Sequence, residues 1–189
     1  MMMTGLILIA SYLIGSIPSG LILTRLFGYG DIRNIGSGNI GATNVMRTGN
    51  KGLALLTFLC DGMKGFLPVF LLHSPFLMVS GLCIILGHIF PIWLRFKGGK
   101  GVATAIGVIL ALNYVAGVSI ILLWLITFRI SRISSLSALT AFAGATIFSF
   151  ALSKEMVIFM LLITMIIFFT HRENISRLLK GKEHKWSKK

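Results

Sequence analysis

Residues 36–47 read Gly-Ser-Gly-Asn-Ile-Gly-Ala-Thr-Asn-Val-Met-Arg and lie between two hydrophobic runs, Met3–Phe27 and Gly52–Leu72. A membrane-spanning helix needs about 20 apolar residues, and each run supplies them. The segment between the runs is therefore predicted to lie at a membrane surface. It offers backbone N–H groups, hydroxyl and amide donors, and the fixed positive charge of Arg47. This composition predicts that the segment binds an anion, with phosphate as the best fit.

The composition of the whole chain is that of a polytopic membrane protein. Of its 189 residues, 56% are hydrophobic and only 12% are charged, and the mean hydropathy is +0.91. Such a chain leaves no room for a large soluble domain. The net charge of +13 comes without a basic-aromatic stripe on a soluble module, so we predict no nucleic-acid partner. Residues 1–16 lack a basic leader, so we expect them to begin the first membrane helix rather than form a signal peptide.

Further hydrophobic runs follow and predict an all-α integral membrane bundle. They are Pro75–Trp93, Val102–Phe128, Leu136–Leu152 and Met156–Thr170. The second of these has two interpretations, one long crossing or two short crossings broken near Asn113. Since residues 102–112 would measure only about 16 Å as a helix, a separate crossing there would have to be tilted, re-entrant or shielded by neighbouring helices.

The distribution of basic residues favours the two-crossing interpretation. It places 16 of the 18 lysines and arginines on one face, Lys188 and Lys189 included, with only Lys154 opposite and Lys64 within a span. Because basic loops mark the cytoplasmic side, we expect about seven transmembrane helices, an N-terminus outside and a cytoplasmic C-terminus. Residues 1–189 would form a single membrane-embedded domain, with cytoplasmic motifs at 36–51, 95–104, 129–137 and 171–183.

A second glycine-rich segment, Phe96-Lys97-Gly98-Gly99-Lys100-Gly101, precedes a helical run that begins at Val102. Glycines before a helix start present unpaired N–H groups and a partial positive charge, and two lysines stand beside them here. The segment lacks the P-loop pattern, and a basic turn that only obeys the positive-inside rule is the alternative interpretation. Because the first segment is predicted on the same face, phosphate binding is the better interpretation.

Asp61 and Lys64 lie within the second hydrophobic run, three residues apart and hence on one helix face. Ionisable groups at membrane depth are costly and usually functional, although a structural ion pair that fixes helix packing is an equal alternative. Gly65 and Pro68 indicate close packing or a kink. We assign His88, near the end of the third run, to packing.

A third polar group follows the last hydrophobic run. His171 and Asn174 share a helix face at the membrane boundary, with Arg177 at the next helical spacing. They are predicted to face the same compartment as both glycine-rich segments, which favours a role in the site. Serine hydroxyls near Arg132 also lie on that face, although a serine-rich turn explains them better: Ser134, Ser135 and Ser137. The five acidic residues are not clustered at metal-site spacing, so we predict neither a metal nor another cofactor.

Together these motifs resemble the bacterial acyl-phosphate-dependent glycerol-3-phosphate acyltransferases of the PlsY type. The resemblance rests on residues 36–47, the span with Asp61, Lys64 and Gly65, residues 96–104, and the tail from His171 to Glu183. One departure is Ile40, where the family pattern has proline. The resemblance implies transfer of a fatty acyl group from acyl phosphate to the sn-1 hydroxyl of glycerol 3-phosphate. The products would be 1-acyl-glycerol 3-phosphate and phosphate, the first step of phospholipid synthesis, on the cytoplasmic face of the bacterial inner membrane.

The resemblance also implies roles for individual residues. Ser37 and Arg47 match residues needed for activity, while His171 and Asn174 match active-site positions. Glu183 matches a structural position, and Asp61 and Lys64 are expected to support the site. The 97–101 loop matches the site for the phosphate of glycerol 3-phosphate. The expected substrate-binding residues are Gly38, Asn39, Thr43, Asn44, Lys97, Gly98, Gly99, Lys100, Gly101, Thr104 and Ser135.

The chemistry of these residues agrees with such a reaction. An acyl phosphate carries a good leaving group, so the site needs neither a covalent acyl-enzyme nor a metal. It must hold two phosphates and aim a hydroxyl at the carbonyl carbon. Whether His171 or a substrate phosphate takes the proton stays open. A membrane permease or antiporter for phosphorylated solutes is the alternative function, against which the lack of an internal repeat counts. A regulatory or scaffold protein would leave the polar segments unexplained.

Overall fold

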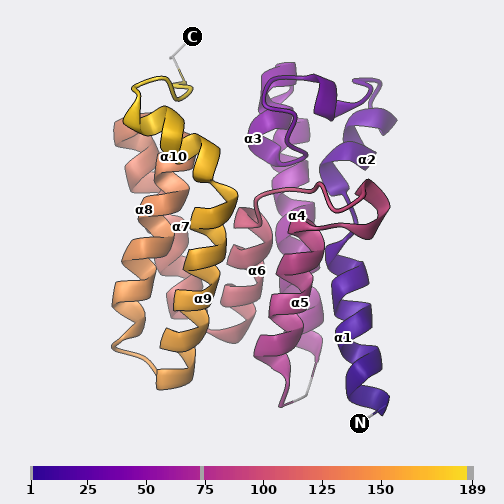
Figure 1. The fold of residues 1–189 in the computed structure, drawn as a ribbon, viewed down its shortest axis with the longest axis vertical. Coiled ribbons are helices and arrows are strands. Elements are labelled where there is room, and N and C mark those ends of the chain that lie inside the picture. Colours follow the sequence, from indigo (N-terminus) through magenta and orange to yellow (C-terminus); the bar gives the residue numbers. More distant parts are fainter. Residues whose placement is uncertain (1, 73–74, 187–189) are drawn as a thin grey trace. The chain divides into compact units, whose positions relative to one another are not determined.

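The computed structural model describes residues 2–72 and 75–186, and its regular elements in these ranges are all helical (Figure 1). This confirms the all-α prediction. Lys188 and Lys189, which the topology argument counts, lie outside the described residues. The α-helices are α1 (Met2–Gly15), α2 (Ser19–Leu26), α3 (Ala42–Val45), α4 (Lys51–Leu71), α5 (Leu77–Ile89), α6 (Val102–Leu112), α7 (Tyr114–Ser131), α8 (Ser134–Ser149), α9 (Lys154–Thr170) and α10 (Arg172–Leu179). Short 3₁₀ turns are η1 (Ile32–Asn34), η2 (Met46–Thr48) and η3 (Ile92–Leu94).

Among the described residues, three helical segments are long and apolar enough to cross a membrane: Lys51–Leu71, Leu77–Leu94 and Tyr114–Ser131. Two bent pairs of helices also pass when each pair is taken as one span, α1 with α2 and α9 with α10. The shorter apolar helices α6 and α8 complete the set. The structure thus contains three to five candidate spans by length and composition, and the count of seven crossings stays a prediction.

The first hydrophobic run is not one helix, as its length suggested, but two helices bent by 41°. The break falls at Ser16–Pro18, because proline has no N–H to donate and its ring disfavours helical geometry in the residue before it. The break leaves the carbonyl of Ile17 to accept a hydrogen bond from Lys64 Nζ at 2.7 Å.

The run over residues 102–128 is broken at Asn113, as its polar side chain suggested. Asn113 has extended backbone geometry, and its side-chain oxygen accepts a hydrogen bond from the N–H of Ala116 at 3.0 Å. This is the geometry of a helix N-cap, which starts α7 afresh after α6 has ended at Leu112.

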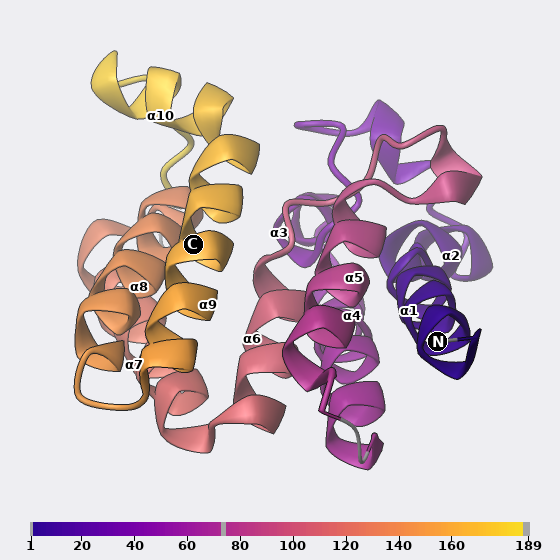
Figure 2. The ribbon, with the colours of Figure 1, turned by 60° about the horizontal axis from the view of Figure 1, so that its bottom comes forward.

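The chain divides into two compact units, Met1–Leu112 and Asn113–Lys189. Within the first, α1 packs on α5, and α4 packs on both α5 and α6. In Figures 1 and 2, α4, α5 and α6 lie side by side, as do α7, α8 and α9 within the second unit. Glycines allow close approaches between helices of the first unit: a Cβ at Gly65 would overlap the carbonyl of Thr104, and one at Gly87 would overlap that of Tyr12. Small residues at helix contacts are typical of membrane bundles.

Candidate active site

The first glycine-rich loop is folded around the buried side chain of Asn44, at the start of the chain segment that leads into α4. Its amide nitrogen donates to the carbonyls of Asn39 and Ile35 at 2.8 and 2.9 Å, and lies 3.1 Å from that of Ile32. Its side-chain oxygen accepts from the N–H of Ser37 at 3.0 Å. Asn44 therefore replaces secondary structure in this loop, since it satisfies backbone groups that would otherwise be unpaired.

Ser37 and Arg47, both predicted site residues, are brought together by this arrangement. Gly36 has a φ of +58°, and a Cβ there would overlap the side chains of Arg47 and Asn44, so only glycine lets Arg47 fold back over the loop. The Ser37 hydroxyl lies 3.3 Å and Arg47 Nη1 3.5 Å from the same oxygen of Asn44. Ser37 is exposed and Arg47 is half-buried. Among the described residues, the buried Nε of Arg47 has no hydrogen-bond partner.

The remaining residues predicted in this loop shape it or line its surface. Gly38 has a φ of +69°, and its N–H donates to the carbonyl of Ile35 at 3.0 Å. The side-chain oxygen of Asn39 accepts from the N–H of Gly41 at 2.9 Å, just before α3. Thr43 is exposed on the first turn of that helix.

Apolar residues anchor the loop from below. Ile32, Ile40 and Val45 are buried in a cluster with Leu21, Leu53 and Ala54, which come from α2 and α4. Ile40, the departure from the family pattern, thus fills the core beneath the loop. Its carbonyl faces Gly20 so closely that a Cβ there would overlap it.

A group of ionic side chains lies on the loop before these residues, and no sequence motif pointed to it. Asp31 accepts hydrogen bonds from Arg25 at 2.9 Å and from Arg33 at 2.6 Å. The hydrogen bond from Arg33 is the main reason that the pKa of the Asp31 carboxyl lies well below its usual range. Asp31 therefore compensates the charges of Arg25 and Arg33, which distinguishes both from Arg47.

The second glycine-rich loop lies back on the end of α5. The N–H groups of Gly98 and Gly99 each donate, at 3.0 Å, to the carbonyls of Ile89 and His88. They are therefore not the unpaired donors that the sequence suggested, because α5 ends with carbonyls that need partners. Arg95 and Phe96, at φ values of +50° and +62°, turn the chain into the loop.

The basic groups of this loop stand beside the start of α6. Lys97 is exposed and Lys100 is half-buried. Gly101, at φ +86°, leads into Val102, and the first turn of α6, Val-Ala-Thr-Ala, is uncharged. The partial positive charge of the helix N-terminus is thus not compensated by its own side chains. Thr104, predicted to bind substrate, is buried and packs against Gly65 of α4.

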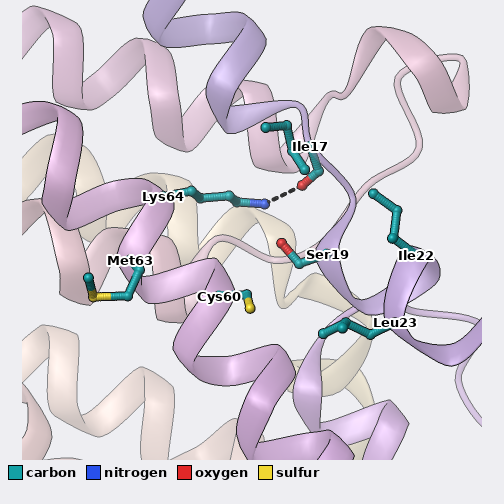
Figure 3. Close-up of a pocket in the computed structure, with 7 residues that line it drawn as sticks. All are labelled: Ile17, Ser19, Ile22, Leu23, Cys60, Met63 and Lys64. Atoms are coloured by element: carbon teal, nitrogen blue, oxygen red, sulfur yellow. Dashed lines mark hydrogen bonds between the residues drawn. The ribbon is translucent and has the colours of Figure 1, made fainter. Parts of the chain in front are cut away.

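Asp61 and Lys64 form the ion pair that their spacing suggested, with 2.7 Å between Oδ1 and Nζ. His88 is the third member of this buried group, because its Nδ1 lies 3.6 Å from Asp61 Oδ1. Sequence reasoning assigned His88 only to packing, and no spacing rule joins it to an acid so far along the chain. Figure 3 shows Lys64 reaching the Ile17 carbonyl beside a cavity of about 370 Å³. The cavity is lined by Ile17, Ser19, Ile22, Leu23, Cys60, Met63 and Lys64.

In the second unit, the Glu183 carboxylate accepts hydrogen bonds from three side chains. Its Oε1 accepts from Ser135 Oγ at 2.8 Å and Asn174 Nδ2 at 2.6 Å, and its Oε2 from Arg177 Nε at 2.6 Å. Burial raises the pKa of Glu183, but the hydrogen bonds from Asn174, Arg177 and Ser135 outweigh it and leave that pKa below its usual value. Glu183 thereby ties the tail to α8 and α10.

Ser134, Ser135 and Ser137 lie in the first turn of α8 and not in the serine-rich turn that the sequence favoured. The contacts of Ser137 are local, since the carbonyl of Ile133 accepts from both its Oγ at 2.8 Å and its N–H at 3.1 Å, within the first turn of the helix.

His171 lies at the joint between α9 and α10, where the chain bends by 65°. It is buried, and its Nδ1 lies 2.8 Å from the carbonyl of Ile167. Facing a carbonyl, Nδ1 is assigned as a hydrogen-bond donor. Asn174, also buried, follows on the same helix face. Among the described residues, no group of three or more histidine, cysteine, aspartate or glutamate side chains could hold a metal ion.

Comparison with known proteins identifies relatives along nearly the whole chain. A model of the family described as "Glycerol-3-phosphate acyltransferase" matches residues 5–181. A glycerol-3-phosphate acyltransferase of Wolbachia pipientis subsp. Culex pipiens (strain wPip) is 48% identical over 187 residues, which cover 96% of this chain and 97% of the relative. That of Paramagnetospirillum magneticum (strain ATCC 700264 / AMB-1) is 51% identical over 180 residues, covering 93% and 90%.

Two solved structures share the fold. The crystal structure of PlsY (YgiH), an integral membrane glycerol 3-phosphate acyltransferase, in its glycerol 3-phosphate form has a TM-score of 0.90 and 40% identity, covering 96% of this chain and 94% of that chain. The lysophosphatidic acid form has a TM-score of 0.88 and 38% identity over the same shares. The helical fold is thus that of an integral membrane acyltransferase. Both the family match and these identities confirm the resemblance seen in the sequence: the chain belongs to the glycerol-3-phosphate acyltransferase family.

Proposed function

We propose that this protein transfers a fatty acyl group from acyl phosphate to the sn-1 hydroxyl of glycerol 3-phosphate. The acceptor and the product correspond to the two ligand forms in which the structural relative PlsY is described. The family assignment favours this reaction over a permease or antiporter for phosphorylated solutes. The observation in this chain that carries the proposal is Arg47, whose buried Nε lacks a hydrogen-bond partner among the described residues while its Nη1 is held beside Ser37.

We assign acyl phosphate as the donor because the sequence lacks the motifs of two other acyltransferase mechanisms and contains basic, glycine-rich segments. Acyltransferases that use thioesters commonly carry His-x-x-x-x-Asp, and none of the 4 histidines here has aspartate five residues later. No Gly-x-Ser-x-Gly nucleophile motif is present in the sequence either. An acyl phosphate needs neither group, because phosphate is already a good leaving group. A basic, glycine-rich site suits a donor and an acceptor that both carry phosphate.

The reaction is a direct displacement. The sn-1 hydroxyl oxygen of glycerol 3-phosphate attacks the acyl carbonyl carbon, the bond from that carbon to the phosphate oxygen breaks, and inorganic phosphate leaves. The hydroxyl proton passes to a substrate phosphate, and His171 orients a substrate by hydrogen bonding. The support for this orienting role is that His171 is buried and its ring is fixed at Nδ1 by the Ile167 carbonyl.

We assign the phosphate contacts to Ser37 and Arg47 of the first loop and to Lys97 and Lys100 of the second, with the N-terminus of α6 adding partial positive charge. Charge-assisted hydrogen bonds from Arg and Lys to phosphate are about twice as strong as neutral ones. Asn44 and Glu183 hold the loops and the tail that carry these groups. Asn174 acts with His171, to which it is adjacent on the helix face.

The whole chain is proposed to form one acyltransferase domain with about seven crossings, an outside N-terminus and an active site facing the cytoplasm. The family match over residues 5–181 covers most of both compact units, which supports a single functional domain. Single cysteines at Gly49, Lys97, Ser134 and Lys182, in a background without Cys60 and Cys83, test the topology. Each should react with an impermeant thiol reagent only when the cytoplasmic side is open, and labelling at position 134 from outside would overturn the arrangement.

The function itself is tested with purified protein, palmitoyl phosphate and glycerol 3-phosphate. We expect release of inorganic phosphate in equal amount to 1-palmitoyl-glycerol 3-phosphate, and essentially no product from palmitoyl-coenzyme A. Arg47→Ala protein, purified in the same way, should release phosphate more slowly, which would tie the activity to this chain rather than to a contaminant. Comparable rates with the thioester would contradict the assigned donor.

A further inference from the structure

We propose that His88 is a positioning residue that sets the placement of the 97–101 loop through direct contact with Gly99, and that Asp61 and Lys64 hold the His88 ring in place. The effect on catalysis rests on the proposed role of this loop in binding the phosphate of glycerol 3-phosphate. The structural part of the proposal stands on contacts within the first unit alone.

Backbone hydrogen bonds join the 97–101 loop to the end of α5. The end of α5 supplies two carbonyls, those of His88 and Ile89, to the N–H groups of Gly99 and Gly98, each at 3.0 Å. The loop therefore depends on where α5 ends. A shift of His88 moves one of these two acceptors directly.

The side chain of His88 also contacts the loop. The Nε2 edge of the His88 ring lies against Gly99, where a Cβ would overlap Nε2 and both neighbouring ring carbons. Gly99 is buried, as is His88, so neither can move aside into solvent. At Gly98, by contrast, a Cβ would overlap the backbone carbonyl of His88 and the ring of Pro91 rather than the His88 side chain. The two neighbouring glycines thus face different parts of the same support.

Asp61 and Lys64 lie on the other edge of the His88 ring. His88 Nδ1 lies 3.6 Å from Asp61 Oδ1, and that oxygen lies 2.7 Å from Lys64 Nζ. Lys64 Nζ also donates to the Ile17 carbonyl at the break between α1 and α2. Less than a tenth of each of these three side chains is exposed. The ring is therefore clamped between a buried ion pair and the loop.

A residue that served packing alone would be better apolar at this depth. Among the described residues, His88 Nδ1 has no hydrogen-bond partner, and burying a polar atom without one costs free energy. The 3.6 Å separation from Asp61 is too long for a hydrogen bond but places the carboxylate beside this edge of the ring. The carboxylate on the Nδ1 side favours the ring orientation in which the Nε2 edge faces Gly99. A leucine or phenylalanine side chain has no polar atom that the carboxylate could orient.

A double-mutant cycle tests the contact. Gly99→Ala and His88→Ala should each raise the KM for glycerol 3-phosphate about tenfold, with a smaller change in kcat, because misplacing a binding group by a fraction of an ångström weakens binding. The double variant should be no worse than Gly99→Ala alone, since removing the ring makes room for the methyl group. In the matched cycle with Gly98→Ala the losses should multiply, because that clash is with backbone and Pro91.

Losses that multiply equally in both cycles would overturn the proposal. His88→Gln, which keeps a polar side chain of similar length, covers the case in which His88→Ala does not fold. It should raise the KM for glycerol 3-phosphate, though less than His88→Ala does. A His88→Gln protein with both the wild-type KM and wild-type hydrogen exchange at the Gly98 and Gly99 amides would also overturn the proposal.

Hydrogen exchange supplies a readout that does not depend on activity. In the wild-type protein the Gly98 and Gly99 amides are hydrogen-bonded, and His88→Ala should speed their exchange about tenfold. Faster exchange with an unchanged KM would uphold the positioning of the loop and refute its assigned role with glycerol 3-phosphate. Unchanged exchange in both His88→Ala and Asp61→Asn would refute the positioning itself.

Discussion

The hydroxyl of Ser37 and the guanidinium of Arg47 meet at one atom, the side-chain oxygen of Asn44, at 3.3 and 3.5 Å. The same oxygen accepts the Ser37 N–H at 3.0 Å. Asn44 therefore fixes the distance between a neutral donor and a permanent positive charge on an exposed loop. Under the proposed function, such a pair would be preorganised for an anion, because its geometry is set without a ligand.

Arg47→Ala should lower kcat/KM by roughly 10- to 100-fold, which corresponds to about 1.5–3 kcal/mol for a lost charge-assisted contact. Arg47→Lys is the matched variant, because it keeps the charge but removes the Nε donor and the planar fork. It should recover only part of the loss. Steady-state kinetics with palmitoyl phosphate and glycerol 3-phosphate measure both, and wild-type kcat/KM in Arg47→Ala would remove this residue from the site.

The two lysines of the second loop should differ in a similar assay. Lys100→Ala should act mainly through the KM for glycerol 3-phosphate, with a loss of roughly 10- to 100-fold in kcat/KM. Lys97 is exposed whereas Lys100 is half-buried, so the effect of Lys97→Ala should be the smaller of the two and more sensitive to salt. Wild-type kinetics in both variants would leave the loop with a topological role only.

Much of the fold could be predicted because hydrophobic run length and polar breaks are local signals. Asn113 indicated a possible break in its hydrophobic run, and the spacing of Asp61 and Lys64 was compatible with the ion pair that they form. Pro18 also carried a signal, yet the hydrophobic run around it was long enough to suggest one continuous helix. The break there matters, because it exposes the carbonyl that Lys64 binds.

The interior of the site could not be predicted, because it depends on where the chain returns. The sequence shows that Gly98 and Gly99 lack side chains but not that their N–H groups are taken by the end of α5. The three carbonyls around Asn44 belong to a loop without a repeating pattern. Likewise His88 and Asp61 lie on different helices, so only the packing of α5 on α4 brings them together.

The buried ion pair gives a prediction about stability. Asp61→Leu alone should cost about 3–5 kcal/mol of unfolding free energy, because it leaves the Lys64 charge buried without its partner. The double variant Asp61→Leu/Lys64→Met should be considerably more stable than the single one, since an apolar pair needs no charge compensation. Unfolding of the purified proteins in one detergent measures the difference. A double variant as unstable as Asp61→Leu would show that the pair does not act as a unit.

The depressed pKa of Glu183 predicts how the tail responds to acid. Its pKa in the folded protein lies below the ordinary value of 4.5, so its hydrogen bonds stabilise the fold fully above that pH. This contribution to the free energy of unfolding is lost as the pH falls from about 4.5 through the folded pKa. The reason is that Glu183 binds a proton at a higher pH in the unfolded chain than in the folded protein.

Glu183→Gln isolates this contribution from that of other acids such as Asp31, which both proteins share. The wild-type protein should unfold at a higher temperature than Glu183→Gln at pH 7, and the gap should narrow below about pH 4.5. Thermal unfolding from pH 7 to pH 3 measures the gap. A constant gap across this range would mean that the carboxylate charge of Glu183 does not hold the tail.

The last prediction concerns the proton. His171 is buried at the joint of α9 and α10, with Nδ1 held by the Ile167 carbonyl. An imidazole in the site could play two roles, a general base or a hydrogen-bonding group that orients the substrate. If His171 were the base, His171→Ala should lose roughly 10²–10⁴-fold in kcat, and the acidic limb of the pH–rate profile should vanish.

We expect the limb to survive, because a phosphate monoester titrates near pH 6 and the proposed site would place a substrate phosphate near the nucleophile. An acyl-phosphate donor would already be activated, so a weak base would suffice. Measurement of kcat against pH for His171→Ala and His171→Gln separates the two mechanisms. Both variants should be slower at every pH, by a similar factor, because a lost orienting contact does not titrate. Loss of the acidic limb in both would instead make His171 the base, and the phosphate only a ligand.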